Sequence, residues 1–117
     1  MTDLQTRVDV RRTTPTVSVL DIHGEVNASS SDALSNAYTK ASDGATVLIL
    51  NFTDMHYMNS TGIGLLVTLL VRANRNNQKV FAFGLNDHYR RIFKLTRLDE
   101  AIQLFNTEIE ATAAAAS

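Results

Sequence analysis

The sequence predicts an α/β fold with a mixed β-sheet, an N-terminal hairpin and about four helices. Strand-like runs rich in Val and Ile alternate with amphipathic runs along the chain, which is typical of parallel strands joined by helical crossovers. One run, Thr46–Phe52, is continuously apolar with β-branched members, as in a strand buried on both faces. The 117 residues are 44% hydrophobic, which is enough for one ordinary core.

The hairpin is predicted from two Val- and Ile-rich segments, Val8–Arg12 and Thr16–Gly24, with a turn at Pro15, the only proline, between them. A first amphipathic helix then begins at Asp32 and is stopped by Asp43-Gly44.

A second helix follows the central strand, after a predicted loop over Thr53–Asn59. Its apolar residues recur with the period of one helix face. The polar segment Asn74–Gln78 ends the helix, and Lys79–Gly84 is predicted as the next strand. From these patterns we expect a core that includes Leu48, Leu50, Ile63, Leu66, Val67, Leu70, Phe81 and Ile92.

The C-terminal part continues the alternation. Asn86 is a predicted cap for a third helix, Ala101–Phe105 is a predicted short strand, and Thr107 is a predicted cap for a final helix that begins at Glu108. We expect residues 1–117 to form a single domain, with its core at about residues 8–110 and a frayed tail at 111–117.

Composition excludes several classes of function. Eleven Lys and Arg residues face twelve Asp and Glu residues, so the charge excess typical of nucleic-acid binders is absent. There is no cysteine for disulfides or thiolate chemistry. The most apolar stretch, Gly62–Val71, is only ten residues long, whereas a membrane-spanning helix needs roughly 20. With no signal-peptide pattern at the N-terminus, the expected location is cytoplasmic.

The sequence offers little for catalysis or cofactor binding. His23, His56 and His88 are far apart and lack metal-ligand spacing, so we interpret them as surface or strand-end residues and expect no metal site. Gly62-Ile63-Gly64 opens a helix where a phosphate loop would lie, but Val67 occupies the third glycine position of a dinucleotide fingerprint. We therefore expect the glycines to serve close packing and predict no cofactor.

Four basic residues along the third predicted helix are interpreted as a solvated face rather than a nucleic-acid site, because aromatic residues are not interleaved with them. They are Arg90, Arg91, Lys94 and Arg97.

Two segments carry a resemblance to a known family. Leu50–Leu66 contains an apolar strand, a polar turn, the block Asn59-Ser60-Thr61-Gly62-Ile63-Gly64 and an apolar helix, and Gly24-Glu25-Val26-Asn27 precedes the first helix. Both segments resemble the STAS domain family, which includes anti-sigma factor antagonists and the tails of sulfate transporters. With the order of elements, the resemblance covers about residues 8–110.

The resemblance implies a bacterial, non-catalytic signalling module that regulates transcription. In the family, an anti-sigma factor that is itself a serine/threonine kinase phosphorylates the hydroxyl residue before the glycine, which corresponds to Thr61, with Ser60 as second choice. The phosphorylated form cannot bind the anti-sigma factor until a phosphatase acts. The implied partner-binding residues are Asn27, Asn59, Ser60, Thr61, Gly62 and Ile63.

The chain departs from the family at two positions that are commonly Asp, since Asn27 and Asn59 stand there. This departure supports an alternative, a structural subunit of a stress-signalling scaffold or of a lipid-transport ATPase that lacks a phosphorylation cycle. A third hypothesis, a small-ligand or nucleotide-binding domain, depends on Gly62-Ile63-Gly64 alone.

Overall fold

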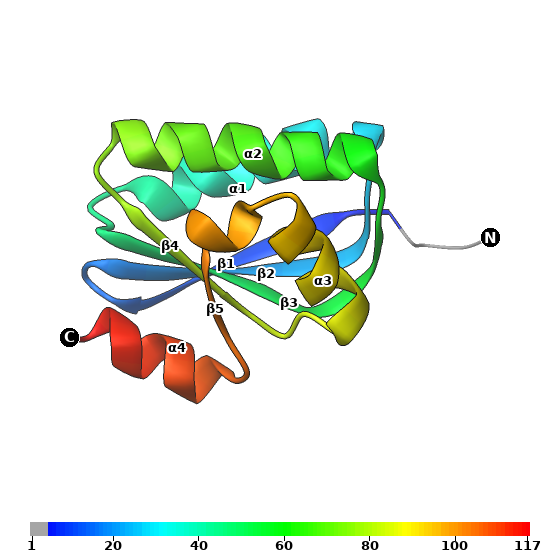
Figure 1. Cartoon of the computed structure of the whole chain (residues 1–117). Coiled ribbons are helices and arrows are strands. Elements are labelled where there is room, and N and C mark those ends of the chain that lie inside the picture. The colour runs from blue at the N-terminus through cyan, green and yellow to red at the C-terminus, as the bar shows by residue number, and fades with distance from the viewer. Residues whose placement is uncertain (1–4) are drawn as a thin grey trace.

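The computed structural model describes residues 5–117, whose strands form one five-stranded sheet in the order β1-β2-β3-β4-β5 (Figure 1). β1 and β2 pair antiparallel as the predicted hairpin, and the remaining neighbours are parallel. The predicted α/β class with a mixed sheet is confirmed. The strands are β1 (Arg7–Thr14), β2 (Val17–Val26), β3 (Val47–Met58), β4 (Lys79–Phe83) and β5 (Gln103–Phe105).

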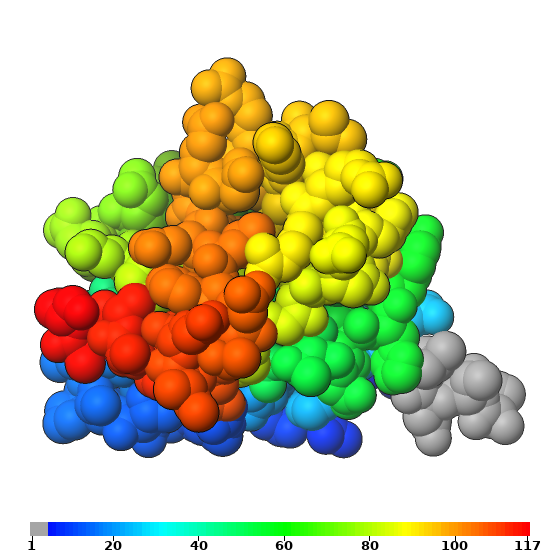
Figure 2. Space-filling model, turned by 60° about the horizontal axis from the view of Figure 1, so that its bottom comes forward, coloured from blue at the N-terminus to red at the C-terminus, as the bar shows by residue number. Residues whose placement is uncertain are grey.

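Three α-helices and two short 3-10 turns connect the strands of the described residues, and a fourth α-helix follows β5. The helices are α1 (Ser31–Ser42), α2 (Ser60–Arg75), α3 (Asp87–Leu95) and α4 (Glu108–Ala115), and the turns are η1 (Ala28–Ser30) and η2 (Leu98–Glu100). Buried residues of α1, α2 and α3 share one core on one face of the sheet, whereas α4 packs on the other face (Figure 1). In Figure 2, α4 lies beside the hairpin strands and β5. Among residues 5–117, no helix combines the length and the apolar character needed to cross a membrane.

Local hydrogen bonds explain where two helices begin. The side chain of Asn86 accepts a hydrogen bond from the Tyr89 amide, and the side chain of Thr107 accepts one from the Glu110 amide. Both predicted caps are confirmed. Each satisfies one of the amides that a helix start leaves without an intrahelical partner.

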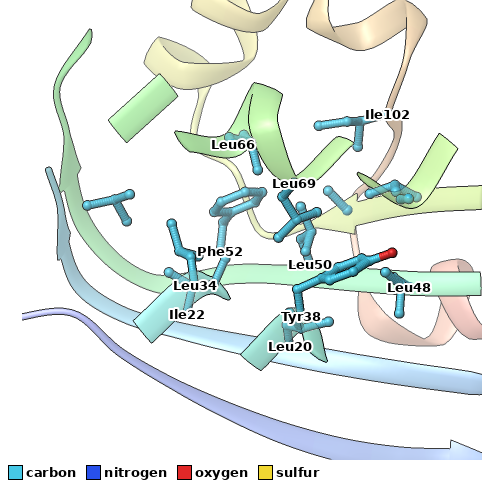
Figure 3. Packing of buried hydrophobic residues seen from close by; sticks show 14 of the residues in the cluster. Leu20, Ile22, Leu34, Tyr38, Leu48, Leu50, Phe52, Leu66, Leu69 and Ile102 are labelled. Atoms are coloured by element: carbon cyan, nitrogen blue, oxygen red, sulfur yellow. The ribbon is translucent and has the colours of Figure 1, made fainter. Parts of the chain in front are cut away.

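The main core lies between the sheet and the three helices on its first face (Figure 3). Leu48, Leu50, Leu66 and Phe81 are buried as predicted, and Ile63, Leu70 and Ile92 are partly buried against this core. Val67 was predicted inside but is 41% exposed. Successive helix residues differ by about 100° in direction, so the buried face of α2 follows Gly62, Leu66, Leu69 and Ala73 and turns Val67 outward.

β3 is longer than the sequence predicts. The expected loop from Thr53 to Asn59 is strand as far as Met58. Its register against β2 shifts twice, between Asp21 and His23 and between Gly24 and Glu25. Met55 and Met58 pack against the main core, so tertiary pairing and burial hold a polar segment extended.

The C-terminal tail also differs from the expectation. The predicted frayed tail at 111–117 is helical to Ala115, because Ala111 is fully buried and Ala114 and Ala115 pack against a second core. That second core lies between α4 and the sheet and contains Val17, Val19, Val47, Ile49, Phe81 and Phe83.

Candidate docking and modification site at the start of α2

The site lies where the parallel strands β2 and β3 end side by side. Val26 and Met58 are partners in the last register position, so Asn27 and Asn59 leave the sheet as neighbours. The Asn59 amide donates to the Val26 carbonyl at 3.2 Å. Two segments that are 32 positions apart in the sequence thus meet at one edge of the sheet.

Asn59 starts α2. Its side-chain Oδ1 accepts a hydrogen bond from the Gly62 amide at 2.9 Å, and its carbonyl accepts one from the Ile63 amide at 3.0 Å. An extended backbone at Asn59 followed by helix at Ser60 is the geometry of an N-cap. This cap places Ser60 and Thr61 in the first turn.

Gly62 holds the start of α2 against the sheet. A Cβ atom at this position would lie 2.3 Å from the Val26 carbonyl oxygen and 2.9 Å from Met58 Cγ. Only glycine allows this approach. The predicted packing role is therefore right for Gly62 and wrong for Gly64, since a Cβ there would meet nothing within 4 Å.

The two hydroxyl residues face outward. Ser60 and Thr61 are exposed, and neither their hydroxyls nor their amides have a hydrogen-bond partner among residues 5–117. Free amides at a helix N-terminus carry partial positive charge. A phosphate on either hydroxyl would therefore meet a favourable field. Ile63 is half-buried against the main core beside them.

Asn27 caps the neighbouring turn instead of α2. Its Oδ1 accepts from the Ser29 amide at 2.9 Å, and its own amide donates to Ser30 Oγ at 2.8 Å. Ser30 is fully buried. The six residues predicted from the family resemblance thus gather at one edge of the sheet, with Asn27 on one connection and the other five on the next.

Sequence reasoning missed one contributor. The Met58 amide donates to the Tyr89 hydroxyl at 2.9 Å in the protein interior. The sequence carries no signal for a hydrogen bond between Tyr89 and a strand residue 31 positions away.

Two of the histidines, His23 and His56, lie beside the same carboxylate, Asp54. His23 Nδ1 is 2.7 Å from Asp54 Oδ2, His23 Nε2 is 3.2 Å from Asp9 Oδ2, and His56 Nε2 is 3.8 Å from Asp54 Oδ1. The hydrogen bond with His23 lowers the pKa of Asp54. No group of three or more metal-ligating side chains suited to a metal ion occurs among residues 5–117.

The basic residues of α3 are partly engaged in structural contacts. Arg90 donates to the Phe105 carbonyl and to Asn106, and Arg97, just after the helix, pairs with Glu100 at 2.9 Å. Arg91 and Lys94 remain exposed.

Comparisons with known proteins agree with this architecture. An anti-sigma-B factor antagonist of Staphylococcus aureus is 33% identical over 69 residues, or 58% of this chain and 64% of that relative. The match therefore spans less than two thirds of the relative's length. A Listeria monocytogenes protein of the same name is 34% identical over 64 residues, or 55% of this chain and 56% of that protein.

Among solved structures, an anti-sigma factor antagonist from Mycobacterium paratuberculosis superposes with a TM-score of 0.83 at 20% identity, covering 99% of this chain and 98% of that one. The phosphorylated form of the Bacillus cell fate determinant SpoIIAA gives 0.71 at 19% identity, covering 92% and 97%. At such identities these likenesses concern the fold. The sequence profile of the STAS domain matches residues 9–111, nearly the whole chain. The chain belongs to the STAS domain family.

Proposed function

We propose that the chain is an anti-sigma factor antagonist: a non-catalytic, cytoplasmic binding module that docks an anti-sigma factor serine/threonine kinase. Phosphorylation of Thr61 switches the docking off, and a phosphatase restores it. The names of the relatives in Staphylococcus and Listeria support this function. The docking surface comprises Asn27 and the segment Asn59–Ile63.

The observation that carries the proposal is the exposed Thr61 hydroxyl in the capped first turn of α2. The cap at Asn59 and the close packing of Gly62 hold the first turn, while the Thr61 side chain stays exposed. A phosphate there adds a charge of about −1.5 to −2 beside the free amides of the turn. The added charge alters the docking surface and leaves the core intact.

Phosphate mapping tests the acceptor. Incubation with anti-sigma factor kinases and Mg-ATP, followed by peptide mass spectrometry, should place phosphate on Thr61. Thr61→Ala should abolish the modification, and Ser60→Ala is the matched control that should keep it. Phosphate on Ser60 alone, or none with several kinases, would reject the assignment.

Binding of the unmodified protein tests the surface. Thr61→Asp should weaken the complex with the anti-sigma factor, because an unpaired carboxylate buried at an interface is costly. Thr16→Asp is a useful control, since Thr16 is also exposed but lies just before β2, at the end of that strand away from Asn27. Equal affinities of the wild type and Thr61→Asp would place the interface elsewhere.

A structural STAS subunit without a phosphorylation cycle is the second candidate. The observation in its favour is that Asn27 and Asn59 stand where the family commonly has Asp. In that case the chain should bind a partner stably while Thr61 stays unmodified in the presence of kinase.

A further inference from the structure

Tyr89 connects α3 to the strand that leads into the site. β4 pairs with β3 only as far as Asn51 opposite Phe83, and β3 then continues to Met58. Among the described residues, no strand lies beside this last part of β3 on the β4 side. The Met58 amide instead donates to the Tyr89 hydroxyl, and both residues are buried, at 4% and 5% exposure.

Because the hydrogen bond between Met58 and Tyr89 is buried, its loss should destabilise the end of β3. A buried backbone amide without a partner costs free energy, because it gives up its hydrogen bond to water on folding and gains none in return. Tyr89 therefore does at Met58 what a neighbouring strand does elsewhere in the sheet.

The backbone of Tyr89 is itself held in place by a helix cap. Its amide donates to the Asn86 cap at 3.0 Å, which fixes the first turn of α3. The preceding Gly84 has φ +87° and lies so close to β3 that a Cβ there would be 2.5 Å from Thr53 Oγ1. The connection from β4 to α3 is thus packed against β3 before Tyr89 reaches Met58.

Met58 directly precedes Asn59, so the hydrogen bond from Met58 to Tyr89 also restrains the start of α2. The next residue, Asn59, donates its amide to the Val26 carbonyl and accepts from the Gly62 amide through its side chain. The end of β3 is therefore held from the α3 side at Met58 and from the β2 side at Asn59. Both hydrogen bonds lie within three residues of Thr61.

We propose that Tyr89 is a positioning residue for the switch: its hydroxyl fixes the end of β3, and through it the cap of α2, in the geometry that docking and modification of Thr61 require. The functional part rests on the proposed function; the positioning itself does not.

Tyr89→Phe tests the proposal because it removes one oxygen atom and keeps the ring. The matched control is Ser18→Ala, which also removes a hydroxyl that makes a buried hydrogen bond. The Ser18 hydroxyl donates to the Ala41 carbonyl at 2.7 Å, at the opposite end of β2. Amide hydrogen exchange followed by NMR should show the Met58 and Gly62 amides exchanging about tenfold faster in Tyr89→Phe than in Ser18→Ala. Equal exchange in the two variants overturns the positioning role.

Kinetics test the functional part with a kinase that modifies the wild type. Phosphorylation of Thr61 should show a several-fold lower kcat/KM in Tyr89→Phe than in Ser18→Ala, and the affinity for the anti-sigma factor should fall in the same direction. Unchanged kinetics and affinity despite faster exchange would overturn the switch role. If no kinase modifies or binds the wild type, the proposed function fails, while the exchange measurement still decides whether Tyr89 positions α2.

Discussion

Asn59 is the residue on which the properties of the proposed switch depend most directly. Its Oδ1 is occupied by the Gly62 amide, and its Nδ2 has no acceptor among residues 5–117. That amide nitrogen can donate to a phosphate on Thr61. An aspartate would also cap the helix, but it would place a negative charge beside the phosphate.

We therefore predict that Asn59→Asp makes phosphorylation more disruptive. At about 4–6 Å and an effective dielectric constant of about 20, two like unit charges repel by roughly 3–4 kcal/mol before salt reduces the effect. The affinity of the phosphorylated variant for the anti-sigma factor should drop below that of phosphorylated wild type, with little change in phosphorylation rate. Calorimetry and kinase assays measure the two quantities.

The competing explanation is that an aspartate at this position orients the acceptor hydroxyl. It requires a large increase in rate for Asn59→Asp with unchanged affinity of the phosphorylated form. That result would contradict the electrostatic account and favour a domain that has lost most of its switching.

At the scale of elements, α2 shows how one helix serves both the core and a surface. It is apolar almost all round, yet Leu66 is 2% exposed and its neighbour Val67 is 41% exposed. Gly62 lies against the Val26 carbonyl with no room for a side chain, so the face of α2 that contains Gly62 is the buried one.

The pair gives a direct prediction for stability. Leu66→Ala should lower the free energy of unfolding by about 2–5 kcal/mol, because it leaves a cavity in the core. Val67→Ala removes somewhat less apolar side chain, at an exposed position, and should change the free energy of unfolding by no more than about 0.5 kcal/mol. Urea unfolding of both variants measures the difference. A comparable loss for Val67→Ala would mean that its outward face is covered in solution.

At the scale of the whole molecule, a charged cluster joins elements from both ends of the chain. Arg11 in β1 pairs with Asp21 in β2 at 2.6 Å and with Glu108 in α4 at 2.9 Å, and Asn51 in β3 donates to Asp21 at 2.8 Å. The hydrogen bond from Arg11 is the main cause that lowers the pKa of Asp21, and burial opposes it. The same contacts raise the pKa of Arg11.

This cluster predicts a pH dependence of stability. Because the folded pKa of Asp21 lies below its ordinary value of about 3.9, its contribution is present above about pH 4 and is lost as the pH falls through the folded pKa. Asp21→Asn should therefore be less stable than wild type near pH 7, and the two should converge in acid. Asp43→Asn is the control, since Asp43 is exposed and has no ion pair among residues 5–117. Parallel pH curves for wild type and Asp21→Asn would refute the prediction.

Much of the fold was predictable because it depends on neighbours in the sequence. The period of apolar residues gave the order of helices and strands, and the caps at Asn86 and Thr107 follow from side chains that bond amides three residues away. Gly62-Ile63-Gly64 likewise indicated a helix start with closely packed glycines, which holds for Gly62. Such interactions are short-range, so the sequence alone contains them.

Tertiary structure decided the features that depend on distant partners. β3 extends to Met58 because β2 pairs with it, α4 persists to Ala115 because the second core receives it, and Tyr89 reaches an amide 31 positions away. The sequence does not distinguish the roles of Gly62 and Gly64, whereas the packed structure brings Val26 and Met58 against Gly62 and leaves space at Gly64. Burial and long-range hydrogen bonding require the packed chain, whereas periodicity and capping chemistry do not.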